Sequence, residues 1–221
     1  MPTSTVEDYL KCILMEQQRD PEGLVSMGRI SAALSVAPGT VTAMVKTLAD
    51  SGLLTYEPYS GVRLTEPGRQ LALHVLRRHR LIELFLVKVM GMDWSEVHSE
   101  AEELEHAVSD RLVERMDEML GFPSADPHGD PIPDVHGIVE EGVLPSLLDC
   151  ELNAPVHVAR VGDQSRDFLR LIERRGLRPG SGLTVESREE IADAVELRLE
   201  SGEKLTLGFR AASKIYVEKT G

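Results

Sequence analysis

The sequence predicts an α+β protein that is mainly α-helical with small β parts. Two observations lead to this fold class, and the length bounds the number of domains. Apolar residues recur at helical spacing through most of the first 112 residues. Two β-prone runs flank a Pro-Tyr-Ser turn at residues 58–60, and alternating apolar and polar residues appear beyond residue 155. The length of 221 residues allows two domains or one large one.

The first elements are helices around a Pro/Gly break. Residues 5–16 form an amphipathic helix. Residues 26–34 and 40–48 form two short helices, and residues 36–39 make the tight break between them. Two short helices joined in this way are typical of a helix-turn-helix. Its apolar positions are Ile30, Leu34, Val41, Val45 and Leu48.

A hairpin and longer helices follow. Residues 52–57 and 61–64 are β-prone and enclose the turn at 58–60. A helix-turn-helix followed by a hairpin is the layout of a winged helix, and a structural three-helix unit without nucleic acid is the alternative. Capping residues then start a helix over about residues 65–90, and apolar spacing places the next helix over residues 97–112.

The winged helix predicts contacts with double-stranded DNA. Small polar or basic side chains on the second helix can reach phosphates and base edges, and those on the hairpin can reach a minor groove or the backbone. With the turn of the motif included, the candidate contact residues are Ala37, Pro38, Gly39, Thr40, Thr42, Lys46, Tyr59 and Arg63.

Three histidines and three glutamates lie at interlocking spacing between residues 78 and 107: His79, Glu83, His98, Glu102, Glu105 and His106. Residues three and four apart share one face of a helix. Imidazole nitrogens and carboxylate oxygens suit a divalent cation of intermediate hardness. A solvated acidic face with incidental histidines is the alternative. The interlocking of six such residues favours a metal site.

The negative charge is concentrated in the middle of the chain. The net charge is −13, and residues 73–150 hold seventeen Asp/Glu against six Lys/Arg. A net acidic protein is an unpromising nucleic-acid binder on bulk charge alone. Because the excess surrounds the expected cation, it does not argue against DNA contacts made elsewhere.

The C-terminal part alternates as half-buried strands do. Strand-like runs cover residues 155–161, 182–186, 196–199 and 204–207, with a helix over 166–175 and a connection over 137–150 before them. The two cysteines, Cys12 and Cys150, do not indicate a disulfide framework. No apolar run is long enough to span a bilayer and no signal-peptide pattern is evident, so a cytoplasmic protein without membrane contact is expected.

One set of residues stands in a specific order between residues 5 and 135. It comprises Tyr9-Leu10, Ile30, Thr40-Val41-Thr42, Leu64-Thr65-Glu66-Pro67-Gly68, Arg78-His79-Arg80-Leu81-Ile82-Glu83, Glu102 to His106, and Pro127-His128-Gly129-Asp130-Pro131-Ile132-Pro133. In this order the chain resembles the diphtheria-toxin-repressor family of metal-activated transcriptional regulators. The resemblance continues more weakly towards the C-terminus.

The resemblance implies a layout of domains and a homodimer formed through the helical one. The layout is a winged-helix DNA-binding domain over residues 1–72, a helical dimerisation and metal-binding domain over 73–140, a linker over 141–150, and an SH3-like (FeoA-like) β-barrel over 151–221.

The resemblance also implies two metal sites. The primary site would use Asp8, Glu102, Glu105 and His106, and Asp126 could add a ligand to it. The ancillary site would use His79, Glu83 and His98, completed by an oxygen ligand from the barrel, for which Asp163 is the first candidate and Gln164 and Asp167 come next.

The ligand types bear on the metal. Iron-responsive members of the family carry Met and Cys at the positions of Asp8 and Glu102. Carboxylates in place of sulfur favour harder ions, so the resemblance implies Mn²⁺, with Fe²⁺ as the alternative. Short manganese-sensing relatives carry a glutamate at the position of Lys11, where it helps to bridge two ions. Because an ammonium cannot ligate, two separated sites are expected here rather than a tight binuclear centre.

The expected function is that of a manganese(II)-activated, homodimeric DNA-binding repressor of metal-uptake genes. Bound metal would cancel the repulsion between facing carboxylates and tie Asp8 to the dimerisation domain, which would fix the recognition helices for a palindromic operator. An iron(II)-dependent regulator and a metal-independent winged-helix regulator are the alternatives. A metallohydrolase is disfavoured because the chain has no His-Glu-x-x-His signature, and no enzyme activity is expected.

Overall fold

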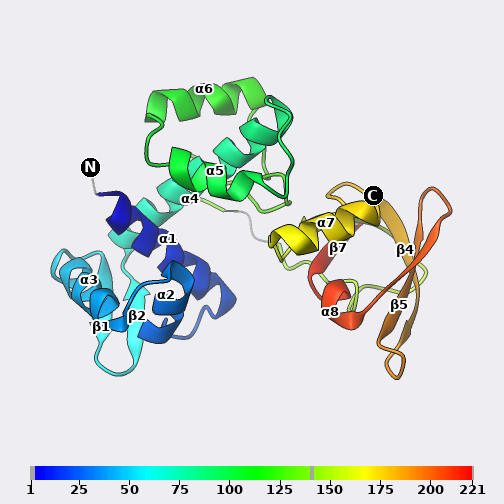
Figure 1. Ribbon diagram of the computed structural model, residues 1–221, viewed down its shortest axis with the longest axis horizontal. Helices are drawn as coiled ribbons and strands as arrows, with labels where there is room; N and C mark the ends of the chain where they lie inside the picture. The colour runs from blue at the N-terminus through cyan, green and yellow to red at the C-terminus, as the bar shows by residue number, and fades with distance from the viewer. Residues whose placement is uncertain (1–2, 140–141, 221) are drawn as a thin grey trace. The chain divides into compact units, whose positions relative to one another are not determined.

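The computed structural model describes residues 3–139 and 142–220 (Figure 1). The chain forms two compact units. The first unit contains the described residues up to His79, together with Glu105–Ala107 and Pro133–Val139. The second contains Arg80–Leu104, Val108–Ile132 and the described residues from 142 onwards. The expected domain boundaries at residues 72, 140 and 150 stay predictions.

The first unit is a winged helix. Its elements are α1 (Ser4–Arg19), α2 (Met27–Leu34), α3 (Pro38–Asp50), β1 (Leu54–Glu57), β2 (Gly61–Leu64) and the first part of α4 (Glu66–Lys88). The two strands pair antiparallel, with Leu54 opposite Leu64 and Glu57 opposite Gly61. One apolar core joins these elements and includes Leu10, Ile13, Ile30, Val41, Val45, Leu48, Val62 and Leu73.

The helix-turn-helix differs from the expectation at one point. Pro38 and Gly39, expected in the break, form the first turn of α3, and Ala37 is its N-cap. Proline suits the first helical turn because its missing N–H would have no intrahelical partner there. The break is therefore only Ser35 to Ala37, and Ser35 adopts a left-handed φ of 53° at the end of α2.

The second unit contains helices and a five-stranded sheet. Its helices are the rest of α4, α5 (Val97–Leu104), α6 (Asp110–Leu120), α7 (Arg166–Arg174) and α8 (Phe209–Ala212). The strands are β3 (Pro155–Val161), β4 (Gly182–Glu189), β5 (Ala194–Leu199), β6 (Lys204–Leu207) and β7 (Ile215–Lys219). They are antiparallel in the order β6-β5-β4-β3-β7. The expected runs at 155–161 and 204–207 are confirmed as strands, whereas β7 was not expected.

The helix expected over residues 97–112 is wrong as a single helix. Helix α5 ends at Leu104 and α6 begins at Asp110, with Ser109 in the extended N-cap conformation at ψ 152°. Serine before an acidic residue favours the start of a helix. The interruption places Glu105 and His106 in a turn, where helical spacing no longer relates them to Glu102.

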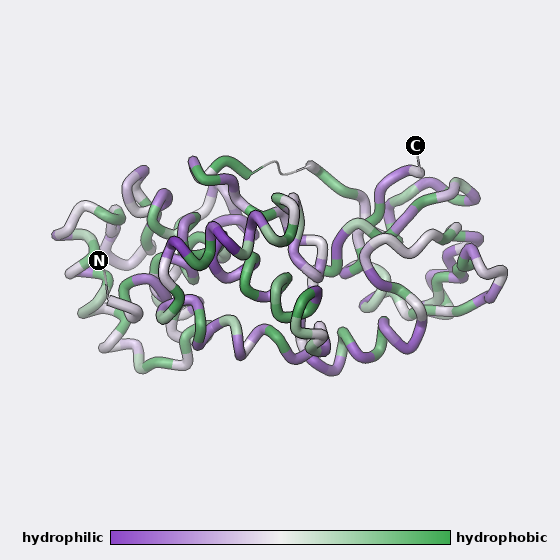
Figure 2. Tube along the Cα trace, turned by 90° about the horizontal axis from the view of Figure 1, so that it is seen from above, coloured by the Kyte–Doolittle hydropathy of each residue, from purple (hydrophilic) through white to green (hydrophobic). Residues whose placement is uncertain are grey.

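Apolar and polar residues alternate along the described trace (Figure 2). Among the described residues, no single helix is long and apolar enough to cross a membrane. Helices α2 and α3 together have the length and the apolar composition of a span, but the chain bends by 111° between them. The described cysteines, Cys12 and Cys150, are buried free thiols.

Candidate metal centre

Three ligand-type residues converge in the first unit. Asp8 comes from α1, and Glu105 and His106 come from the turn after α5. His106 Nε2 lies 2.8 Å from Asp8 Oδ1 and 3.4 Å from Glu105 Oε1. One donor atom from each residue lies within 4.8 Å of the others. We call Asp8, Glu105 and His106 the first cluster. It unites three of the four ligands expected for the primary site.

The imidazole of His106 is held from both sides. Its Nδ1 lies 2.8 Å from Glu7 Oε2, and its Nε2 faces Asp8. Burial alone would lower the pKa of His106, but the carboxylates of Glu7, Asp8 and Glu105 outweigh it and raise the pKa. A proton and a metal ion therefore compete for this ring.

Glu105 is fully buried and surrounded by cationic or donating groups. Its Oε1 lies 2.6 Å from Lys11 Nζ, and its Oε2 lies 2.6 Å from His79 Nδ1. Arg78 Nη1 donates to the Glu105 carbonyl at 2.8 Å. Burial raises the pKa of Glu105, but His79 and Lys11 overcome that effect and hold it below its ordinary value. The repulsion expected between facing carboxylates is thus partly offset at Glu105 by Lys11 and His79.

A second group of ligand-type residues lies in the second unit. Glu83, Asp126 and His128 are all buried and offer donor atoms within 4.8 Å of one another. We call them the second cluster. Glu83 is on α4, and the other two belong to the loop after α6. This grouping differs from the expectation, which gave Asp126 to the primary site and left His128 without a role.

The ring of His128 is oriented as in many metal sites. Its Nε2 donates to the Trp94 carbonyl at 2.9 Å, and the ring stacks on Trp94 with centroids 5.5 Å apart. Its Nδ1 lies 3.8 Å from Glu83 Oε2 and 4.0 Å from Asp126 Oδ2. This nitrogen has no hydrogen-bond partner among the described residues. Burial lowers the pKa of His128, but Asp126 and Glu83 outweigh it and raise the pKa.

The loop that carries the second cluster is firmly held. Asp126 Oδ1 accepts the backbone N–H groups of His128 at 2.8 Å and Asp130 at 3.0 Å. Gly129 has a φ of 87°, and a Cβ added there would lie 2.0 Å from the Ala159 carbonyl oxygen. The loop therefore packs directly against β3, and Val161 N–H donates to the His128 carbonyl at 2.9 Å.

Two of the ligands expected for the ancillary site, Glu83 and His98, lie close together. His98 Nδ1 lies 3.1 Å from Glu83 Oε1, and its Nε2 lies 3.7 Å from Glu102 Oε1. Glu102 thus faces His98 on α5. His79, expected in the ancillary site, lies one turn before Glu83 on α4 and contacts Glu105.

The candidates from the barrel also have partners. Asp163 pairs with Lys214 and accepts Ser165 N–H at 2.9 Å. Burial raises the pKa of Asp163, but Lys214 and Ser165 keep it low. Gln164 Nε2 donates to Asp130 Oδ2 at 2.7 Å, so it supports the loop of the second cluster.

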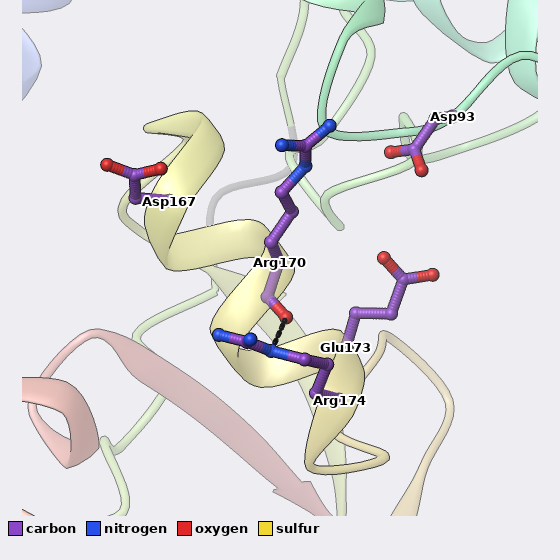
Figure 3. A pocket seen from close by; sticks show the side chains of 5 residues that line it. All are labelled: Asp93, Asp167, Arg170, Glu173 and Arg174. Atoms are coloured by element: carbon purple, nitrogen blue, oxygen red, sulfur yellow. Dashed lines mark hydrogen bonds between the residues drawn. The ribbon is translucent and has the colours of Figure 1, made fainter.

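Asp167 lines a cavity of about 470 Å³ beside α7 (Figure 3). The other lining residues are Asp93, Arg170, Glu173 and Arg174. Acidic and basic groups line it together, and Arg170 and Glu173 have partners outside it, Glu96 and Trp94.

The expected DNA-contact residues are mostly accessible. Ala37, Pro38, Gly39, Thr40 and Lys46 are exposed at the start and on the outer face of α3, and Tyr59 is fully exposed at the hairpin tip. Thr42 is half-buried and its hydroxyl donates to the Pro38 carbonyl at 2.9 Å.

Arg63 differs from the other candidates. Its guanidinium donates to the carbonyls of Pro21, Glu22 and Gly23 at 2.9, 2.7 and 3.1 Å. These bonds hold the turn after α1 against the hairpin. Its donors thus serve the fold of the first unit.

Comparisons with known proteins agree with this architecture. Residues 1–62 match the iron-dependent repressor N-terminal DNA-binding domain, and residues 65–134 match the iron-dependent repressor metal-binding and dimerisation domain. Residues 146–219 match the FeoA domain. The iron-dependent repressor IdeR of Mycobacterium tuberculosis is 33% identical over 231 residues, covering 97% of each chain. The chain belongs to the iron-dependent repressor family.

Solved structures in this family share the fold. A manganese-dependent transcriptional repressor in complex with manganese is 39% identical, with a TM-score of 0.86, and covers 97% of this chain and 100% of that one. The manganese regulator SloR is 34% identical, with a TM-score of 0.75, and both chains are fully covered. This repressor is therefore a metal-dependent, DNA-binding transcriptional regulator and not an enzyme. The expected family and fold class are confirmed.

Sequence reasoning gave no role in the clusters to Glu7, Arg78 and His128, and it treated Lys11 only as a residue that cannot ligate, without its contact with Glu105. His128 could have been noticed, because it lies in a Pro-His-Gly-Asp-Pro segment two residues after Asp126. The partners of the other three are distant in the sequence. Lys11 and Glu105, for example, are 94 residues apart.

Proposed function

We propose that this repressor is activated by Mn²⁺ and binds a palindromic operator as a homodimer, repressing metal-uptake genes. The observation that carries the proposal is the first cluster, whose donor atoms are carboxylate oxygens and an imidazole nitrogen. Such donors suit Mn²⁺. Manganese-dependent repressors among the similar structures add support. Fe²⁺ is the second candidate, because the similar IdeR is iron-dependent.

In this proposal Asp8, Glu105 and His106 hold one ion, with Glu102 as the fourth expected ligand. The bound ion supplies positive charge that links α1 to the turn after α5. Helix α1 also carries Leu10 and Ile13, which pack in the same core as Val41 and Val45 of α3. Holding Asp8 in place therefore restrains the helix on which the recognition helix rests.

A second ion is proposed at Glu83. The partners favoured by the geometry are Asp126 and His128, because the buried His128 Nδ1 points towards both carboxylates. The expected set of His79, Glu83 and His98 with Asp163 is the alternative. Variants separate the two: His128→Ala should remove one bound Mn²⁺ per chain and His98→Ala should not. The reverse result would support the alternative.

The proposed dimer forms through the helices of the second unit. Large apolar side chains are exposed there at Val89, Met90, Leu112, Met119 and Phe122. Methionine and aromatic side chains such as Met90, Met119 and Phe122 are enriched at protein–protein interfaces. The proposed DNA contacts come from Ala37 to Thr40, Thr42, Lys46 and Tyr59, with Arg63 holding the hairpin that presents Tyr59.

Operator affinity at fixed salt tests the proposal, because DNA affinity depends steeply on salt. Operator binding should be strongest with Mn²⁺, weaker with Fe²⁺ and Zn²⁺, and weakest with a chelator. Asp8→Ala should lose the response to metal and keep dimerisation. A metal-independent regulator would bind the operator equally well in chelator, and that result would refute the proposal.

A further inference from the structure

Lys11 has an unusual position for a lysine. It lies on α1, three residues after Asp8, and its side chain is only 7% exposed. Lysine is rarely buried unless its charge is compensated. Here the Lys11 ammonium lies 2.6 Å from Glu105 Oε1. It therefore forms a buried ion pair with a residue of the first cluster.

The same carboxylate oxygen faces the other members of the cluster. Glu105 Oε1 lies 3.4 Å from His106 Nε2, which in turn lies 2.8 Å from Asp8 Oδ1. The ammonium thus contacts the oxygen through which Glu105 approaches His106. An ion that binds this oxygen must share it with Lys11 or displace it.

Part of the negative charge around the first cluster is already compensated by side chains. Glu7, Asp8 and Glu105 contribute three carboxylates, while Lys11 and Arg78 contribute two cations, and Arg78 Nη1 lies 3.8 Å from Glu7 Oε2. A divalent ion bound to Glu105 Oε1 would lie beside the Lys11 ammonium, so two cations would share one carboxylate oxygen. At these short distances and in a buried setting the repulsion between the ion and the ammonium is strong.

We propose that Lys11 is a resident counter-charge that competes with the metal ion for Glu105 and so raises the metal concentration needed to fill the first site. This inference rests on the proposed role of the first cluster as a metal site. Lys11 stabilises the metal-free arrangement and opposes the metal-bound one. Lys11 thereby sets the Mn²⁺ concentration at which the first site fills.

Mn²⁺ binding to the full-length protein tests the inference. The first site is the binding step that Asp8→Ala removes from a calorimetric titration. Lys11→Met, which is one atom shorter than lysine and removes the charge, should tighten that step by about tenfold or more. The melting temperature of the metal-free Lys11→Met protein should fall, and added Mn²⁺ should raise it by more than in the wild type.

Two control variants test whether a change in Mn²⁺ affinity comes from the loss of the Lys11 charge. Lys11→Arg keeps the charge and should retain the wild-type affinity for Mn²⁺. Lys219→Met removes a lysine from an exposed pair with Glu151 and should also bind as the wild type does. Lys11→Gln is the second neutral variant and decides the question if Lys11→Met does not fold.

Unchanged or weaker Mn²⁺ binding in the neutral variants would overturn the inference, since a lysine with a purely structural role predicts weaker binding. Failure of the proposed function gives a different result. In that case Asp8→Ala removes no binding step, whatever happens at Lys11.

Discussion

The first and second clusters both gather carboxylates around a histidine, but their polar atoms find partners in different ways. In the first cluster, both ring nitrogens of His106 face carboxylates, and Lys11 and His79 contact Glu105. In the second, His128 Nδ1 has no hydrogen-bond partner in the part of the chain that the structure describes. A buried polar atom without a partner is costly. The second cluster therefore gains more from an ion than the first, where an ion must compete with side chains already in place.

The largest expected effect concerns the pairing of charges in the first cluster. Glu105→Ala leaves Lys11 buried beside an apolar side chain, and breaking a buried ion pair costs about 3–5 kcal/mol of unfolding free energy. Urea denaturation in chelator measures it. The control is Glu118→Ala, which breaks an exposed pair with Arg115 and should cost about 0–1 kcal/mol. Equal losses in both variants would mean that the Lys11–Glu105 pair is not important for stability.

The next largest effect is expected from a substitution in the backbone of the loop that carries the second cluster. Gly129→Ala puts a Cβ against the Ala159 carbonyl at a φ of 87°, and strain of this kind costs about 1–3 kcal/mol. Mn²⁺ binding at Glu83, Asp126 and His128 should weaken, while the step that depends on Asp8 remains. Gly142→Ala is the matched control, because no described atom lies within 4 Å of a Cβ added there. A Gly129→Ala protein with wild-type stability and metal binding would contradict this reading of the loop.

The groups that orient the two histidines differ in kind. A side chain, Glu7, holds His106, whereas the Trp94 backbone carbonyl holds His128. Loss of such a supporting partner typically lowers metal affinity by about 10–100-fold. Glu7→Gln should therefore weaken Mn²⁺ binding at the first cluster by about tenfold and leave the second unaffected. Calorimetry with Glu7→Gln, and with Glu114→Gln as an exposed control, distinguishes this outcome from a general loss of binding.

The smallest expected effect is a dependence of the stability of the metal-free protein on pH. The pKa of His106 is raised, so its protonated form contributes stability to the metal-free protein below the ordinary pKa of histidine, and this contribution disappears as the pH rises through the raised value. Thermal unfolding in chelator should show this loss in the wild type and not in His106→Gln. Mn²⁺ affinity should follow the opposite trend and increase with pH, because the metal needs the neutral ring. A stability difference between the two proteins that does not change with pH would contradict the prediction.

Local patterns were enough for much of the fold. Apolar spacing indicated α1, α2, α3 and α4, and the β-prone runs around residues 58–60 indicated the hairpin. The interruption between α5 and α6 was missed, because Val97, Ala101, Leu104, Val108 and Leu112 keep helical spacing across it. Strand β7 was also missed: it has only five residues, and its place between the chain end and β3 is set by pairing with a distant strand.

The sequence by itself determined which residues could bind a metal and in what order they occur, because the chemistry of imidazole and carboxylate groups does not depend on the fold. It also determined the winged helix, whose elements follow from spacing within short segments. The family resemblance already placed Asp8 with Glu105 and His106, whereas only the tertiary structure brought Glu83 together with Asp126 and His128. The contact between the Lys11 ammonium and Glu105 is also visible only in the tertiary structure. The physical reason is that periodicity relates residues within one helix, whereas these groups meet across segments as many as 98 residues apart, where packing and the pairing of buried charges select the partners.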